Sequence, residues 1–311
     1  MNLGNIKNMV RRMHRYGIWL SISNLILVYG RRHLPPSILK KTGDSRNKLI
    51  RRKVSHYLPA ISDPICTPTP LIIKDNAIWV CWLQGEEHMP ELVRICWKSI
   101  QKNSAGHDVV LLSLDNYSDY VVIPPVALNK YIDKKLSHAH FADIIRMNLL
   151  AQQGGLWLDA TMLLTAPVAQ SIFDMPFFSI KTRPQGYFVS DCRWAVFTLA
   201  CKRGCDIMPR VAKAFENYME NNDILIDYFL FDHFIDILYR TDATVRQIID
   251  AVPFNNPDVH ALRTLIAQDY NEPLMNKMTE STQMFKLNTR TWSPTELESN
   301  PKSLYQFLKK I

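Results

Sequence analysis

The stretch that decides the fold reads Ala139-His-Phe-Ala-Asp-Ile-Ile-Arg-Met-Asn-Leu-Leu-Ala-Gln-Gln-Gly-Gly-Leu-Trp-Leu-Asp-Ala-Thr161. Apolar residues continue at helical spacing to about Gln153, and the two glycines that follow are a strong signal for a helix end. The apolar run 156–164 then has the length of a buried strand. A helix that leads through a glycine turn into a buried strand indicates an α/β fold.

Two charged residues lie on the helix of this stretch. Asp143 and Arg146 are three positions apart, so they share one face of a helix that is otherwise largely apolar. Because a buried charge is costly without a partner, the two residues either form an ion pair that secures the helix or bind a ligand.

An acid lies near the end of this apolar strand, just after the glycine turn. Asp159 and Thr161 alternate with apolar neighbours and therefore project from the same face. A divalent cation bridging a diphosphate would give this acid a partner, since Mg²⁺ and Mn²⁺ prefer carboxylate and phosphate oxygens. The alternative is a buried aspartate that accepts hydrogen bonds from loop amides.

The residues before this stretch predict a βαβ unit. Apolar runs at 77–83 and 108–114 have strand length, and a helix begins between them at Pro90. The two strands should be parallel and joined by a right-handed crossover. Ligands of open α/β sheets bind beyond the carboxyl ends of the strands, where both Trp82 and Asp159 are expected.

The C-terminal half predicts further helices at about 208–220, 224–240 and 257–268, and a strand at 283–287. Ser293-Pro-Thr-Glu296 has the spacing of a capping box and predicts the start of a terminal helix.

The net charge of +8 is concentrated at the N-terminus. Of 37 bases and 29 acids, residues 1–58 contain thirteen bases and one acid, which leaves 24 bases and 28 acids for the remainder. We therefore expect a basic helical arm, residues 1–58, and a main α/β domain, residues 59–311.

The arm contains an apolar stretch, residues 16–29, of about fourteen residues, which is short of the roughly 20 that a membrane-spanning helix needs. Basic residues on both sides are typical of a helix that lies in an anionic membrane surface. A helix packed on the main domain is the alternative. Binding of nucleic acid is not expected, because no zinc finger, RNP-type motif or aromatic platform occurs.

Other classes of protein are disfavoured. The sequence has no Gly-x-Gly-x-x-Gly motif, no phosphate-binding loop and no Gly-x-Ser-x-Gly elbow. Its six cysteines form no Cys-x-x-Cys pair, and no small-x-small cleavage site follows the apolar stretch. We expect reduced thiols and a cytoplasmic protein on the inner face of the cell membrane.

The order of these motifs resembles that of the capsular polysaccharide synthesis proteins, which are bacterial relatives of glycosyltransferase family 32. More distantly, it is similar to the glucosyltransferase domains of large clostridial toxins. The resemblance covers roughly residues 75–170. It rests on the segments Ile78-Trp-Val-Cys-Trp82-Leu-Gln-Gly85, Pro90, Asn116-Tyr117 with Tyr120 and Pro124, Asp143 to Arg146, and Gly154 to Thr161.

The resemblance implies a GT-A fold, a nucleotide-sugar donor, Mn²⁺ or Mg²⁺ as cofactor, and retention of anomeric configuration. Asp159 would be the catalytic, metal-holding acid, with Thr161 at the second metal position. Asp143 and Arg146 would bind the donor sugar, and Trp82 would stack on the donor base. The usual acid-x-acid motif reads Asp-Ala-Thr here, as in capsular members, so the second carboxylate is missing.

Two C-terminal regions complete the expected site. Further donor contacts are expected from Gly154, Gly155, Lys286 and Trp292, the last two in a loop over the diphosphate. For this loop, a surface strand with solvated bases is the alternative. Asp232 and His233 would line an acceptor cleft, with core packing as their alternative.

The function expected from the resemblance is that of a hexosyltransferase. The sugar would move from a nucleotide-sugar, with UDP favoured, to a lipid-linked oligosaccharide in capsular polysaccharide synthesis. A catalytically silent nucleotide-sugar-binding component of an assembly complex is the alternative, because the second carboxylate is missing.

Overall fold

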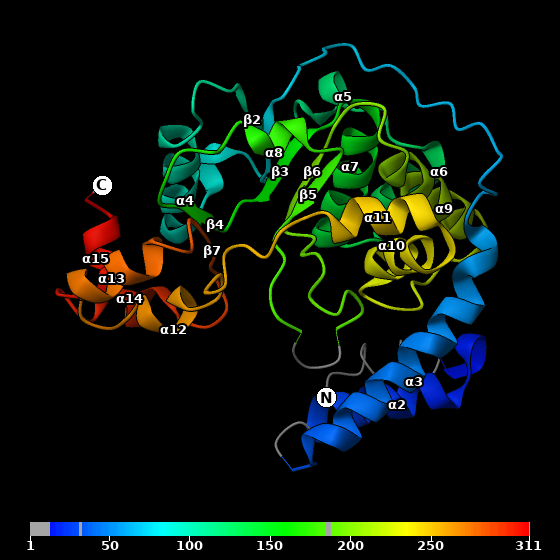
Figure 1. The fold of residues 1–311 in the computed structure, drawn as a ribbon, viewed down its shortest axis with the longest axis horizontal. Helices are drawn as coiled ribbons and strands as arrows, with labels where there is room; N and C mark the ends of the chain where they lie inside the picture. The colour runs from blue at the N-terminus through cyan, green and yellow to red at the C-terminus, as the bar shows by residue number, and fades with distance from the viewer. Residues whose placement is uncertain (1–12, 31–32, 185–187, 311) are drawn as a thin grey trace.

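The computed structural model describes residues 13–30, 33–184 and 188–310. A five-stranded mixed sheet lies at its centre with helices around it, and a helical arm extends from one end (Figure 1). The strand order is β2-β1-β3-β6-β5. This architecture confirms the predicted fold class, a Rossmann-like mixed sheet flanked by helices with a helical arm.

β2, β1 and β3 are parallel, β6 runs against them, and the edge strand β5 is antiparallel to β6 and so runs in the direction of the first three. The strands are β1 (Ile78–Cys81), β2 (Val109–Leu112), β3 (Gly155–Asp159), β5 (Phe177–Ser179) and β6 (Thr198–Cys201). Cys81 lies opposite Asp159 in the register of β1 and β3. The carboxyl ends of both strands therefore meet at one edge of the sheet, as the sequence predicted.

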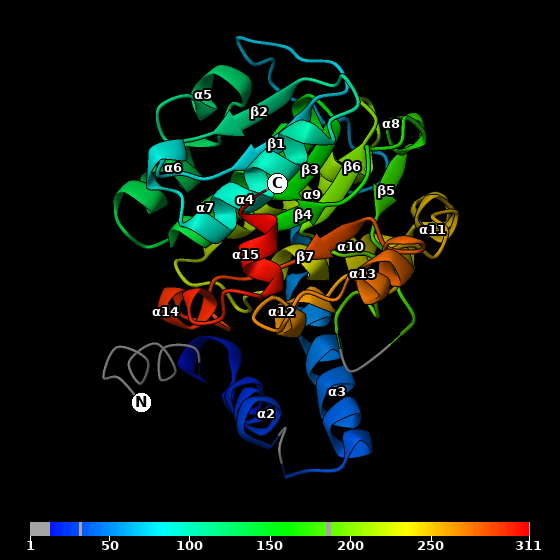
Figure 2. The ribbon, with the colours of Figure 1, turned by 90° about the vertical axis from the view of Figure 1, so that its left-hand side faces the viewer.

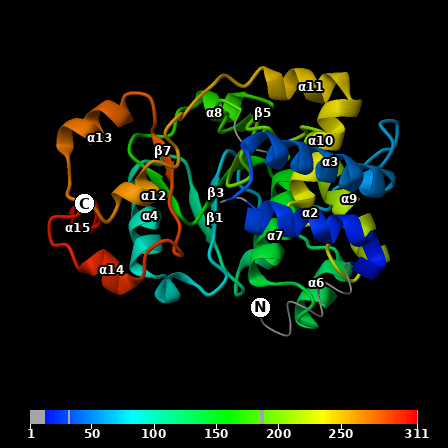
Figure 3. The same ribbon diagram turned by 90° about the horizontal axis from the view of Figure 1, so that it is seen from below.

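The two main crossover helices cover opposite faces of the sheet. α4 (Glu91–Lys102) leads from β1 out to β2, and α7 (His138–Gln152) leads back from β2 to β3. Because right-handed crossovers in opposite directions lie on opposite faces, α4 and α7 lie on either side of β1 and β3 (Figure 3). Short helices fill the connections: η3 (Glu86–His88), α5 (Tyr117–Tyr120), α6 (Pro125–Ile132) and α8 (Ser171–Asp174).

The glycine pair makes the predicted turn between α7 and β3. Gly154 and Gly155 have φ values of +72° and +89°, which L side chains rarely adopt. A Cβ on Gly154 would lie 2.6 Å from the carbonyl oxygen of Cys201, and one on Gly155 would lie 2.5 Å from that of Ala77. Both residues are therefore required by the backbone where the helix enters the sheet.

The predicted strand 156–164 is in fact two strands. The chain leaves the central sheet after Asp159, and β4 (Met162–Leu164) pairs with β7 (Met284–Lys286) in a separate antiparallel sheet. Four short helices surround this second sheet (Figure 2). They are α12 (Leu262–Leu265), α13 (Glu272–Thr279), α14 (Pro294–Glu298) and α15 (Leu304–Leu308). Together with one face of α4 they form a second apolar cluster.

The remaining helices differ from expectation mainly at their ends. The helix predicted at 208–220 is α9 (Ile207–Asn221), which packs against α7, and the one predicted at 224–240 begins later, as α10 (Leu230–Thr241). α11 (Ala243–Asp250) was not predicted, and the helix expected at 257–268 is reduced to α12. The capping box that begins α14 is confirmed, since Ser293 Oγ accepts a hydrogen bond from the Glu296 amide.

The arm is joined to the main domain through its second helix. α2 (Ile18–Tyr29) and α3 (Pro36–Val54) lie side by side (Figure 3), and η2 (Ser55–Tyr57) follows α3. Ile50 and Val54 of α3 are fully buried in the main core. Arg46 donates to Asp227 at 2.5 Å, and Arg51 donates to Asp236 at 2.8 Å. The C-terminal part of the predicted arm, helix α3, is thus part of the folded domain.

α2 has an apolar outer surface. Ile18, Val28 and Tyr29 are 60%, 67% and 62% exposed, whereas Ser21 and Ser23 are buried. Among the described residues, the longest apolar helical segments are too short to cross a membrane.

Replacement of Gly155 by alanine is expected to cost at least about 2 kcal/mol of unfolding free energy, because it adds a backbone clash to a left-handed conformation. Gly204 is the matched control: its φ is +85°, but among the described residues no atom would lie within 4 Å of a Cβ added there. Gly204→Ala should cost only about 1 kcal/mol. Urea denaturation measures both values, and equal losses would contradict the assigned role of the turn.

Candidate functional site

A cluster of charged side chains lies at the carboxyl edge of β1 and β3. At the tip of β3, Asp159 Oδ2 accepts a hydrogen bond from Lys286 Nζ at 2.6 Å. Its Oδ1 accepts from Trp157 Nε1 at 3.0 Å and from Arg146 Nη2 at 3.2 Å. The carboxylate is one-quarter exposed, with 26% of the side chain accessible. It therefore faces solvent while three donors hold it.

Arg146 connects the two acids predicted from the sequence. Its Nη2 lies 2.9 Å from Asp143 Oδ1, so the ion pair expected within α7 is present, but Arg146 also contacts Asp159. The guanidinium carbon lies 5.1 Å from the centroid of the Trp157 ring and 5.7 Å from that of Phe231. Arg146 is 5% exposed, and its Nε and Nη1 have no hydrogen-bond partner among the described residues.

The two acids differ in their protonation. Burial raises the pKa of Asp143 to about 6, against the opposing effect of Arg146. Burial would also raise the pKa of Asp159, but Lys286 and Arg146 outweigh it and lower that pKa to about 2. Asp159 is thus a permanent anion, whereas Asp143 changes charge just below neutral pH.

A third acid lies behind this pair. Asp232 is 8% exposed and accepts a hydrogen bond from Trp194 Nε1 at 2.9 Å. Burial raises its pKa to about 7, and the charge of Asp143 acts in the same direction. Asp232, which the sequence predicted for an acceptor cleft, is therefore close enough to Asp143 to share its electrostatic environment.

Other predicted residues lie around this cluster with different contacts. Trp82 directly follows β1, is half-buried and donates from Nε1 to the His88 carbonyl at 3.3 Å. The Thr161 carbonyl accepts from the Leu287 amide at 2.9 Å, between β4 and β7. Trp292 packs on the C-terminal apolar cluster and donates from Nε1 to the Arg263 carbonyl at 2.8 Å.

Three predicted residues are not brought to the Asp159 carboxylate. Gly154 and Gly155 lie at the amino end of β3, so the length of the strand separates them from the charged edge. His233 is fully buried and bonds through Nε2 to Asp227 at 3.0 Å, beside Arg46 of the arm. Gly154 and Gly155 form a backbone turn, and His233 stabilises the contact between α3 of the arm and the main domain.

Tyr228 was not singled out as a site residue from the sequence. Its ring is 51% exposed and lies 5.3 Å from that of His140, between centroids. Burial raises the pKa of Tyr228, and the charges of Asp143 and Asp159 contribute, so the ring lies within electrostatic range of the charged cluster. The sequence signal for Tyr228 is the run 227–233, which is rich in acids and aromatic residues. The helix here was predicted to begin at about residue 224, whereas α10 begins at Leu230 and leaves Tyr228 in the preceding turn.

Without a bound donor, the residues present do not fit a resident Mn²⁺ or Mg²⁺ ion. Mg²⁺ takes six ligands, of which a protein usually supplies one or two carboxylates, while substrate phosphates and waters supply the others. Asp159 offers one carboxylate, which three donors already occupy, and position 161 is a threonine. In the part of the chain that the structure describes, no group of three or more His, Cys, Asp or Glu side chains could hold a metal.

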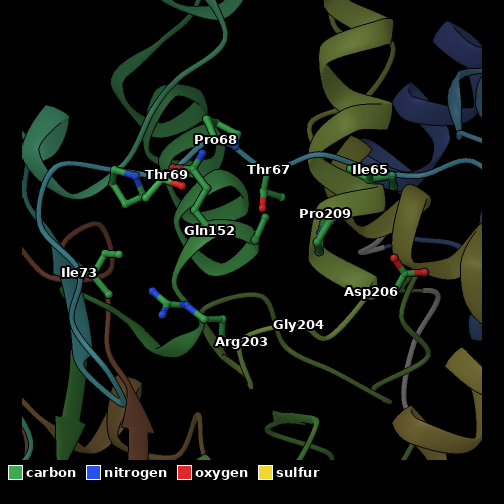
Figure 4. Close-up of a pocket in the computed structure, with 12 residues that line it drawn as sticks. Ile65, Thr67, Pro68, Thr69, Ile73, Gln152, Arg203, Gly204, Asp206 and Pro209 are labelled. Atoms are coloured by element: carbon green, nitrogen blue, oxygen red, sulfur yellow. The ribbon is translucent and has the colours of Figure 1, made fainter.

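A surface cavity of about 410 Å³ lies elsewhere on the molecule (Figure 4). The linker residues Ile65, Thr67 and Pro68 line one side of it, and Arg203 and Asp206 lie on the other. Gln152, at the end of α7, also lines it. The cavity is therefore at the amino end of β3, away from the charged cluster.

The sheet and the charged cluster at the carboxyl ends of its parallel strands define an α/β protein of the class that binds ligands at this edge. The chain belongs to the capsular polysaccharide synthesis protein family, whose sequence profile matches residues 33–308. This confirms the family resemblance of the motifs, and it supports a glycosyltransferase role.

Among solved structures, the chain is similar to the PaToxG glycosyltransferase. The two share 13% identity with a TM-score of 0.38, over 88% of this chain and 97% of that one. A search of curated proteins found no match to the chain.

Replacement of Asp143 by asparagine is expected to change the pH dependence of stability. Because the folded-state pKa of Asp143 is raised to about 6, its stabilising contribution is full below the unfolded pKa and is lost as the pH rises through 6. The unfolding free energy of Asp143→Asn, relative to the native protein, should therefore increase by about 2 kcal/mol between pH 4 and pH 7.

Urea denaturation at each pH measures this difference. Asp115→Asn, at an exposed position, is the control and should show no such trend. A difference that stays constant from pH 4 to pH 7 would contradict the assignment to Asp143.

Proposed function

We propose that this protein is a retaining glycosyltransferase that moves a hexose from a nucleotide-sugar, with UDP as the favoured nucleotide, to a lipid-linked oligosaccharide in capsular polysaccharide synthesis. The observation that carries the proposal is the convergence of Asp143, Arg146 and Asp159 at the carboxyl edge of the sheet. Membership in the capsular polysaccharide synthesis protein family supports it independently.

The energetics of the cluster favour binding over a purely structural role. Replacing a buried ion pair by apolar residues of similar volume is often neutral or stabilising, so stability alone is a weak reason to keep one. Arg146 is buried with two nitrogens that have no hydrogen-bond partner among the described residues, while Asp159 stays partly open to solvent. A polar ligand at this edge would use the charges that the fold holds in place.

In the proposed reaction, Asp143 accepts hydrogen bonds from hydroxyls of the donor sugar, and Arg146 donates to the same donor. Trp82, at the end of β1, stacks on the base. The acceptor hydroxyl attacks the anomeric carbon from the side that the diphosphate leaves, so the new C–O bond forms as the old one breaks. The departing diphosphate oxygen takes the acceptor proton, and the configuration is retained.

The acceptor side of the site is assigned to the start of α10. Tyr228 and Phe229 are 51% and 46% exposed, and their ring centroids are 5.1 Å apart in an edge-on arrangement. Exposed aromatic rings beside a polar site can pack on the apolar faces of sugar rings. Asp232, in the first turn of α10, accepts a hydrogen bond from the acceptor in this proposal.

We further propose that the protein acts in the cytoplasm, on the inner face of the cell membrane, with α2 in the anionic lipid surface. Ile18, Ile22, Leu25 and Tyr29 recur at helical spacing and are all exposed. The arm around them carries thirteen bases and one acid. An exposed apolar helix face within a strongly basic segment matches the chemistry of an anionic bilayer surface.

The glycosyltransferase proposal is tested by a screen of nucleotide-sugars with purified protein, with and without Mn²⁺, in which release of nucleoside diphosphate is measured. Asp159→Asn is expected to reduce release by a factor of about 100 or more, because Lys286 and Arg146 lose the carboxylate that fixes their positive charges in place. Asp174→Asn, on an exposed turn of α8, is the control and should retain full activity.

A silent binding component would behave differently in this screen. Saturable binding of a nucleotide-sugar without release of nucleoside diphosphate, with or without an added acceptor, would exclude catalysis and favour that alternative.

The membrane proposal is tested by sedimentation with vesicles of neutral or anionic lipid. The double variant Ile22→Glu and Leu25→Glu should bind anionic vesicles at least about tenfold more weakly, because it removes apolar contact and adds charge repulsion. Ile132→Glu, at a site on α6 that is 66% exposed, is the control. Equal sedimentation of the double variant and the native protein would contradict the role of α2.

A further inference from the structure

Lys286 occupies the position at Asp159 where a cation is expected. Its Nζ lies 2.6 Å from Asp159 Oδ2, and its side chain is only 13% exposed. The ammonium group also lies 5.3 Å from the centroid of the Phe197 ring. The ion pair joins residues 127 positions apart in sequence, so it depends on the tertiary fold.

The backbone of Lys286 is held in place. It is the last residue of β7 and pairs with Met162 of β4. Its amide donates to the Val259 carbonyl at 2.7 Å, and its carbonyl accepts from Arg263 Nε at 3.1 Å. A lysine fixed at its backbone and paired at its tip is a preorganised positive charge.

A divalent ion at Asp159 would compete directly with this lysine. A carboxylate-bound Mg²⁺ lies about 2.1 Å from its oxygen ligands, so an ion on Asp159 Oδ2 would need the space that the ammonium group holds. The two like charges would repel each other at contact distance. A second carboxylate at position 161 would offset this repulsion, but that residue is a threonine.

The surroundings of Lys286 are already cationic. Burial lowers the pKa of the neighbouring His260 to about 4, and the charges of Arg263 and Lys286 act in the same direction. Arg146 adds a further charge on the opposite side of Asp159. Positive charges, on Lys286 and Arg146, therefore lie on both sides of Asp159.

We propose that Lys286 is the resident cation of the donor site, and that its ammonium group binds the diphosphate directly in place of a divalent metal. In the described part of the chain, one of its three N–H groups bonds Asp159, which leaves two to donate to phosphate oxygens. Binding of a nucleoside diphosphate then requires no divalent ion. This inference rests on the glycosyltransferase function proposed above.

The test is isothermal titration of UDP, and separately of GDP, into the full-length protein in EDTA and in MnCl₂. The native protein should bind one of them with the same Kd, within about twofold, in both buffers. Lys286→Met should weaken binding in EDTA by a factor of about ten or more, because a charge-assisted hydrogen bond is lost. Lys286→Arg should recover most of the affinity, and Lys98→Met, at an exposed position of α4, should be neutral.

A second measurement uses only the native protein, so it does not depend on whether the variants fold. The electron paramagnetic resonance signal of free Mn²⁺ should fall no further with native protein plus UDP than with UDP alone. Binding of UDP only in MnCl₂, with uptake of Mn²⁺ by the complex, would overturn the role of Lys286 and leave the proposed function intact. Failure of both UDP and GDP to bind in either buffer would count against the proposed function itself.

Discussion

The structure depends on the hydrogen bonds and ion pairs that stabilise the carboxylate of Asp159 at the end of a buried strand. A charge in this position is costly unless it is paired and hydrogen-bonded. Three donors from three parts of the chain meet it: Arg146 from α7, Trp157 from β3 and Lys286 from β7. The helix before the strand, the strand itself and the separate C-terminal sheet are therefore connected through one side chain.

This constraint explains the division of the molecule into two sheets. The chain leaves the central sheet just after Asp159 so that β4 can pair with β7, and that pairing holds Lys286 beside the carboxylate. The C-terminal helices and one face of α4 then cover the second sheet with a second apolar cluster. A second charged network, in which Arg46 and His233 bond Asp227, joins the arm to the same domain. The family profile begins at residue 33, so it includes α3 and leaves out α2.

Much of the fold could be predicted from the sequence because its signals are local. The periodicity of α7, the glycine turn and the apolar run of β1 gave the order and type of the central elements. The pairing of Arg146 with Asp143 followed from helical spacing alone. The contact between Asp159 and Lys286 could only be guessed as part of a loop, because 127 positions separate the two residues and no local pattern encodes their distance.

Other features were beyond local patterns for similar reasons. Gly154 and Gly155 form part of a family motif, and from it they were expected to contact the donor. The structure places them at the opposite end of β3 from Asp159, where positive φ angles and close backbone contacts require glycine. The break between β3 and β4 lies at residues 160–161, inside a segment whose apolar and polar residues alternate as in a single strand, so periodicity could not reveal it. α2 and α3 both belong to a basic segment, yet only the tertiary structure shows that α3 is anchored in the core while α2 keeps an apolar surface exposed.

The central claim is that the charged edge of the sheet binds the diphosphate of a sugar donor. A crystal structure of the protein with a bound nucleotide-sugar, grown in EDTA, tests it most directly. We expect the diphosphate oxygens within hydrogen-bond distance of Lys286 Nζ, with the sugar beside Asp143 and Arg146. A donor bound elsewhere, for instance in the cavity near Arg203, would contradict the account.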